Sequence, residues 1–96
     1  MTDKPDIDLA EVHRLVEALE RDLHRIDQGE GDVATLRDEV RALAEVLDRP
    51  SAHPQDVKVQ LHAVHGQLDE LATTPIGRGT LKAAEYLARL GRMLGL

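Results

Sequence analysis

Apolar residues recur along this chain at alternating spacings of three and four, the pattern of helices that bury one face. One such row, in a segment from about 8 to 27, comprises Leu9, Val12, Val16, Leu19, Leu23 and Ile26. The next, from about 33 to 48, comprises Val33, Leu36, Val40, Leu43 and Leu47. A third, from about 54 to 72, comprises Val57, Leu61, Val64, Leu68 and Leu71. Each segment is predicted to be an amphipathic helix.

Residues with capping preferences stand at the ends of these segments. Asp6 or Asp8 can cap the start of the first helix, and Gly29 can end it. Asp32 is a candidate cap for the second helix. Pro54 suits the first turn of the third, because a proline there loses no helical hydrogen bond.

A fourth helix is predicted over about 75–94, and two starts are open for it. Thr74 can cap the full-length version. Gly77 and Gly79 weaken its first turns, however, so Thr80 could instead cap a shorter helix.

Four such segments joined by short turns predict an all-α protein, an antiparallel four-helix bundle in up-down-up-down order. The 96 residues form a single domain, of which 1–6 are expected to be disordered.

The fourth segment carries more apolar surface than one core requires. Its charged residues fall within an arc of about 80° at 100° per residue: Arg78, Lys82, Glu85, Arg89 and Arg92. One side of the remainder carries the large residues Ile76, Leu87, Leu90, Met93 and Leu94. The other side carries the small residues Gly77, Ala84, Ala88, Gly91 and Gly95. Large side chains fill cores, whereas small ones let a second backbone come close.

Three interpretations of the small side follow. Both sides could pack inside one monomer. The small side could instead meet a second helical chain, most simply a second copy in a homodimer, with Ala84, Ala88 and Gly91 at the closest approach. A third interpretation, an amphipathic helix on an anionic membrane, lacks aromatic anchors. We favour the homodimer.

Composition narrows the function classes. The net charge of −6 argues against nucleic acid as a partner, since phosphate binding needs a basic surface. The charge is uneven: residues 1–74 hold eight basic and 17 acidic residues, a net charge of −9, whereas residues 75–96 hold four and one, a net charge of +3. With no cysteine, no leader-like run after Met1 and no apolar membrane span, the chain is expected in the cytoplasm.

Two histidines stand three positions apart in the third helix. Since the apolar row points inward, Lys58, His62, His65 and Asp69 are predicted to form one outward stripe. The histidines are therefore not expected in the core.

The run His62-Ala63-Val64-His65-Gly66 resembles the phosphorylation site of histidine phosphotransfer domains, which are helical bundles. Their local pattern is His, any residue, an apolar residue, Lys, Gly, and this run agrees at four of five positions. The resemblance implies an exposed nucleophile at His62 and room for a partner at Gly66. The departure is His65, where the family has lysine; Lys58, one turn earlier, could supply the positive charge instead. A signalling module using His62 is the alternative function.

The sequence gives little support for a metal site, a phosphate-binding loop or a catalytic site. Zinc needs about four ligands, so His62 and His65 would need His53 or a second subunit. The first predicted helix carries an outward stripe similar to the one that holds His62 and His65, and it comprises His13, Glu17, Glu20 and His24. The GRGTLK run, 77–82, lacks the length and ending of a phosphate loop. No nucleophile–base–acid arrangement is visible. We therefore expect no enzyme activity, no metal or other cofactor and no small-molecule substrate.

Overall fold

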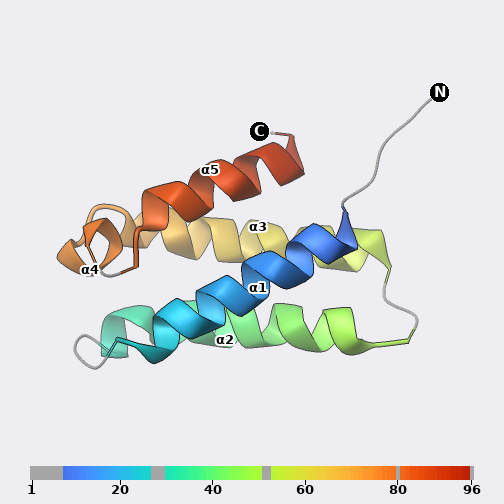
Figure 1. Cartoon of the computed structure of the whole chain (residues 1–96), viewed down its shortest axis with the longest axis horizontal. Helices are drawn as coiled ribbons and strands as arrows, with labels where there is room; N and C mark the ends of the chain where they lie inside the picture. The colour runs from blue at the N-terminus through green and yellow to red at the C-terminus, as the bar shows by residue number, and fades with distance from the viewer. Residues whose placement is uncertain (1–7, 27–29, 51–52, 80, 96) are drawn as a thin grey trace.

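The computed structural model describes residues 8–26, 30–50, 53–79 and 81–95, without the side chains of 30–32, 76 and 77 (Figure 1). Four long helices and one single turn make up this part of the chain. They are α1 (Leu9–His24), α2 (Glu30–Asp48), α3 (Pro54–Leu71), the turn α4 (Pro75–Arg78) and α5 (Ala83–Leu94). The predicted all-α four-helix bundle is confirmed. The disorder expected for residues 1–6 lies outside the described residues.

The long helices alternate in direction along the chain, as up-down-up-down order requires (Figure 1). In this view α1 crosses the front of the bundle, α3 lies behind it, and α2 and α5 take opposite edges. Helix α3 packs closely against both α2 and α5, and α1 packs against α2. Helices α1 and α5 approach each other less closely, so this side of the bundle is the least tightly closed.

The described core is almost wholly aliphatic, with no charged side chain buried in it. All five apolar residues predicted for the third helix are buried there, as the spacing requires. The prediction that Leu9 belongs to the buried face of the first helix was wrong, because this residue is 37% exposed. Leu15 and Val46, outside the predicted rows, are buried. Each helix of a bundle faces two neighbours, so its buried stripe is wider than a two-position seam.

Helix α1 begins as predicted. The Asp8 carboxylate accepts hydrogen bonds from the backbone N–H groups of Ala10, at 3.0 Å, and Glu11, at 3.4 Å. These bonds satisfy donors that a helix start otherwise leaves free. Of the two aspartates that could cap, Asp8 therefore does so.

Helix α1 ends at His24, three residues before the predicted end. The Arg37 guanidinium of α2 donates to the carbonyl oxygens of Leu23, at 2.7 Å, and Ile26, at 3.1 Å. It thereby satisfies carbonyls that have no partner within the helix. The predicted stop, Gly29, lies outside the described residues.

Helix α2 begins at Glu30, earlier than predicted, so Asp32 lies inside the helix and the cap assigned to it was wrong. Helix α3 begins at Pro54, as its fixed backbone angle and missing N–H suggest.

The fourth predicted helix is broken. A single turn, α4, ends at Arg78, and α5 starts only at Ala83. The Thr74 hydroxyl donates to the Leu71 carbonyl oxygen at 2.7 Å, at the end of α3. The residue before α5 is Lys82, whose φ of 55° is left-handed and whose side chain makes no capping bond. Thr80, the alternative cap, lies outside the described residues.

The position of Leu81 explains this break. Leu90 stands nine positions after Leu81, so an unbroken helix would point their side chains about 180° apart. Both side chains are fully buried. The chain can bury both only by leaving the helix before Ala83, which turns Leu81 back into the core.

Candidate interaction surface

Helix α5 divides into a buried side and an exposed side. Ala83, Tyr86 and Leu90 are buried, while Leu87, Met93 and Leu94 are half-buried and pack against the core. The large-residue side therefore faces the bundle, as its composition indicates. Of that predicted set, Ile76 lies outside the described side chains.

The small residues lie at the surface. Ala84, Ala88 and Gly95 are exposed, and Gly91 is half-buried. Packing of this face inside the monomer is thereby excluded for the three exposed residues. Gly77 belongs to α4, so the break between α4 and α5 separates it from the other four. We call Ala84, Ala88, Gly91 and Gly95 the α5 outer face.

Among the residues that the structure describes, none requires glycine at position 91. A Cβ atom built on Gly91 would meet nothing within 4 Å, and the same holds for Gly66 in the middle of α3. A glycine inside a helix costs about 0.5–1 kcal/mol relative to alanine. Both helices therefore carry this cost without a packing reason in the described part of the monomer.

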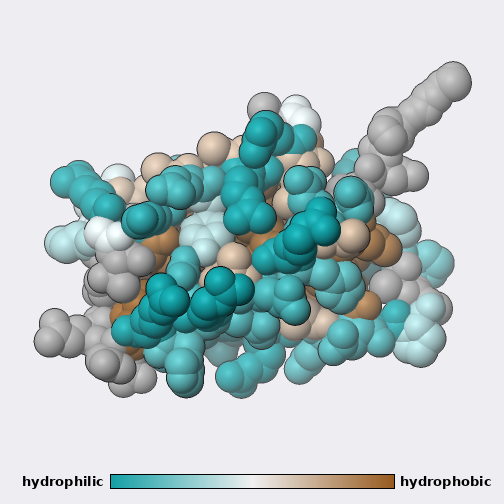
Figure 2. Space-filling view, viewed as in Figure 1, coloured by the Kyte–Doolittle hydropathy of each residue, from teal (hydrophilic) through white to brown (hydrophobic). Residues whose placement is uncertain are grey.

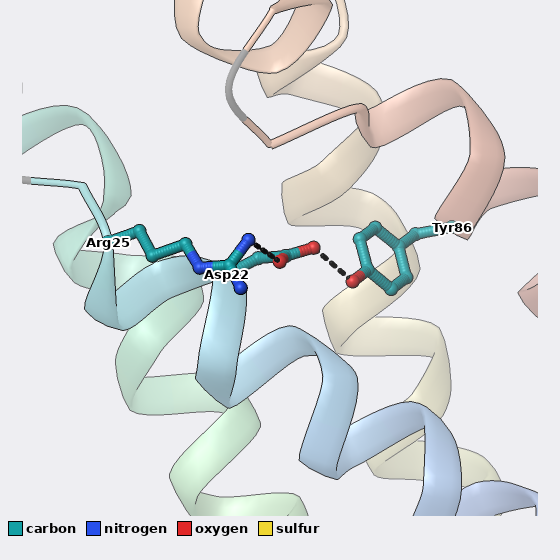
Figure 3. A network of polar contacts seen from close by, with 3 residues as sticks. All are labelled: Asp22, Arg25 and Tyr86. Atoms are coloured by element: carbon teal, nitrogen blue, oxygen red, sulfur yellow. Dashed lines mark hydrogen bonds and ion pairs between the residues drawn. The ribbon is translucent and has the colours of Figure 1, made fainter.

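The loosely closed side of the bundle is bridged by a polar network (Figure 3). The hydroxyl of Tyr86 in α5 donates a hydrogen bond to Oδ2 of Asp22 in α1. Oδ1 of the same carboxylate lies 3.8 Å from Nη1 of Arg25. The Arg89 guanidinium lies over the Tyr86 ring, 5.9 Å from its centroid. Figure 2 shows hydrophobic atoms between α5 and α1, among hydrophilic side chains that cover most of this face.

Burial raises the pKa of the Tyr86 hydroxyl far above its ordinary value of 10.0. The hydrogen bond to Asp22 and the negative charge of that carboxylate raise the pKa further, whereas the charges of Arg89 and Arg21 lower it. The hydroxyl is thus held in its protonated, donating form. The sequence marked Tyr86 only as the single aromatic residue, and no local pattern pairs it with a residue 64 positions away.

The histidines lie where the helical spacing placed them. His62 is exposed on α3, and His65 and Lys58 are half-buried at the surface. Val64 is buried, whereas Gly66 is exposed with open space around it. The side chain of His62 is therefore accessible to a large partner.

Within the ranges that the structure describes, no three His, Cys, Asp or Glu side chains gather closely enough to hold a metal ion. A solvent-open hollow lies between α1 and α2, with Glu20, His24 and Arg41 beside Leu23 and Val40. The capping Arg37 also lines this hollow.

No known protein family, curated protein or solved structure matches the chain. Among the described helices, none is long and apolar enough to cross a membrane.

Proposed function

We propose that this chain is a non-enzymatic, cytoplasmic protein that acts through protein–protein contact and forms a homodimer through the α5 outer face. The observation that carries the proposal is the exposure of Ala84 and Ala88 beside Gly91, whose Cβ position is empty. Small residues one turn apart leave a shallow surface on which a second helix can lie at short backbone distance.

The energetics of Gly91 support this assignment. A glycine that destabilises the isolated helix by about 0.5–1 kcal/mol is explained if a neighbouring backbone occupies the space a side chain would fill. A second copy is the simplest such neighbour, because closed two-fold pairing is the commonest form of soluble oligomer. Another helical protein is the other partner that this surface suits.

Light scattering on the full chain across a concentration series tests the homodimer. We expect a mass near twice the monomer's 10.6 kDa. Gly91→Leu places a branched side chain at the closest approach and should shift the mass to that of the monomer. A matched control is Gly66→Leu, which adds the same side chain to a mid-helix glycine with open space on α3, and it should stay dimeric.

Two results would contradict the proposal. One is a monomer mass at every concentration. The other is equal dissociation of the dimer by the Gly66 and Gly91 variants, since that would show a general effect of leucine on the fold. Circular dichroism on each variant separates loss of association from loss of helix.

A second candidate function is phosphotransfer at His62. It is supported by the exposure of His62 and by the open space at Gly66 one turn later. In this reaction an imidazole nitrogen attacks the phosphoryl group of a donor, a P–N bond forms as the donor's bond to phosphorus breaks, and the imidazole proton leaves. Accessible histidine and room for the donor are the geometric requirements.

Intact-mass spectrometry after incubation with donor histidine kinases and with phosphoramidate tests this candidate. An acid-labile addition of one phosphoryl group should be lost in His62→Gln and kept in His65→Gln. His65→Lys restores the family's pattern and should increase labelling. If no donor labels the native chain or the His65→Lys variant, the phosphotransfer function is wrong.

A further inference from the structure

Arginines of α1, of its C-terminal end and of α5 lie near the hydrogen bond between Tyr86 and Asp22. Arg25 lies 3.8 Å from Asp22, and Arg89 lies over the Tyr86 ring. Arg21 is exposed on α1, next to Asp22 in the sequence and one helical turn before Arg25. Three positive charges and one negative give this group a net charge of +2 within a chain of −6. We call Arg21, Arg25 and Arg89 the arginine cluster.

The cluster keeps most of its hydrogen-bonding capacity. One carboxylate oxygen of Asp22 accepts the hydrogen bond from Tyr86. The other lies 3.8 Å from Arg25, a longer distance than the about 2.7–2.9 Å typical of a charge-assisted hydrogen bond. The Arg25 side chain is 67% exposed. Within the described residues, neither Arg21 nor Arg89 forms an ion pair. Each guanidinium carries five donors, so many are left to water.

We propose that the arginine cluster binds the carboxylates of an acidic peptide segment of a partner protein. Arg21 and Arg25 stand one helical turn apart, with Cβ atoms about 5–6 Å from each other. Arg89 adds a third guanidinium from the facing helix. Such an arrangement can hold two or more carboxylates in bidentate pairs, which is the geometry that planar guanidinium groups favour.

Charge selects an acidic peptide over a nucleic acid. With the cluster's +2 set aside, the rest of the chain carries a net charge of −8. A long polyanion would extend beyond three arginines and meet that repulsion, whereas a short acidic segment would stay within the cluster.

This surface is separate from the α5 outer face. At 100° per residue, Arg89 lies about 100° around α5 from Ala88 and about 160° from Gly91. An acidic segment on the cluster would leave the outer face uncovered. The two proposals can therefore fail independently, and the monomeric Gly91→Leu variant should still bind the peptide.

Tyr86 gives the binding experiment a direct reporter, since it is the only tyrosine and the chain has no tryptophan. A hexaglutamate peptide titrated into the full chain at low ionic strength should change the Tyr86 emission to saturation and release or absorb heat in calorimetry. Hexaglutamine should do neither. Absence of both signals with hexaglutamate would overturn the proposal.

Charge-matched variants localise the binding. The double variant Arg21→Gln/Arg89→Gln should weaken hexaglutamate binding by about tenfold or more, as expected when charge-assisted hydrogen bonds are lost. The control Arg41→Gln/Arg49→Gln removes two exposed arginines of α2 and its end, and should change binding by less than about twofold. Equal weakening by both pairs would mean a long-range charge effect and would overturn the site.

Asp22→Asn tests the sign of the effect. This substitution removes the carboxylate that competes with the peptide for Arg25. Asp38→Asn is the control, because Asp38 is exposed on α2 and its replacement changes the charge by the same amount. Hexaglutamate should bind the Asp22→Asn variant more tightly than the Asp38→Asn variant. The two variants are compared by the midpoints of their hexaglutamate titrations, because the Tyr86 emission itself changes when Asp22 is replaced. Equal binding by the two variants, or tighter binding of single-stranded DNA than of hexaglutamate by the native chain, would count against the proposal.

Discussion

The Tyr86 hydroxyl and the Asp22 carboxylate form a hydrogen bond across the side of the bundle where the helices approach least closely. The two residues are 64 positions apart and belong to the first and last long helices. Tyr86 is mostly buried, and the Asp22 side chain is only 26% exposed. The bond therefore stabilises the docking of α5 while satisfying a carboxylate that has lost much of its water.

Replacing Tyr86 by phenylalanine should lower the free energy of unfolding by about 1–2 kcal/mol. The ring still fills its space, so the loss comes from the missing donor and from the partly buried Asp22 carboxylate left without it. Urea denaturation followed by circular dichroism measures the change.

Arg25→Gln is the control for that experiment, because it removes the other contact of the same carboxylate. Its 3.8 Å ion pair is largely exposed and should contribute no more than about 1 kcal/mol. If Arg25→Gln destabilised the fold more than Tyr86→Phe, the hydroxyl would not be the principal bond across this side.

Stability should also depend on alkaline pH through Tyr86. Its pKa in the fold lies above the ordinary 10.0, so the protonated hydroxyl stabilises the folded state. This contribution is fully present below about pH 10 and is lost as the pH rises from there through the raised pKa. Near-ultraviolet absorbance should show tyrosinate in the urea-unfolded chain near pH 10 and only at clearly higher pH in the folded chain.

The Asp22→Asn variant isolates the cause of that shift. It removes the acceptor's negative charge but not the burial of Tyr86, so the ionisation midpoint should fall only part of the way towards 10.0. An unchanged midpoint would show that Asp22 has no influence on the hydroxyl.

The helical fold was predictable because its signal is local. Val57, Leu61 and Val64 share one face through spacing alone, and Asp8 caps α1 through its own short side chain. The end of α1 was not predictable, because it depends on Arg37 reaching from another helix. The break before α5 also escaped prediction, since it follows from the demand that Leu81 and Leu90 be buried together.

The candidate surfaces were predictable only in part. Exposure of Ala84 and Ala88 opposite the large residues follows from helical periodicity, and so does the outward position of His62. The arginine cluster does not, since Arg89 and Arg25 lie on helices far apart in sequence. They are linked only through the hydrogen bond between Tyr86 and Asp22, which depends on how α5 docks against α1 and which no spacing within one helix encodes.

Lys82 offers a test of the break itself. Its left-handed backbone, φ 55°, costs a residue with a Cβ atom about 1 kcal/mol or more. Lys82→Gly should therefore raise stability by several tenths to about 1 kcal/mol, even though glycine also loses more entropy on folding. Lys58→Gly, inside α3, should lower stability by a similar amount. Destabilisation by both would show that Lys82 is not left-handed in solution.

Replacement by alanine should change the stability of the fold in opposite directions at Gly66 and Gly95, because their backbone conformations differ. Gly66→Ala should stabilise the fold by about 0.5–1 kcal/mol, because the helix is regular there and the new methyl group meets nothing within 4 Å. Gly95→Ala should destabilise it by about 1 kcal/mol, because φ 73° at the end of α5 is left-handed. Thermal and urea unfolding measure both. A gain at both positions would mean that α5 does not end in a left-handed residue at Gly95.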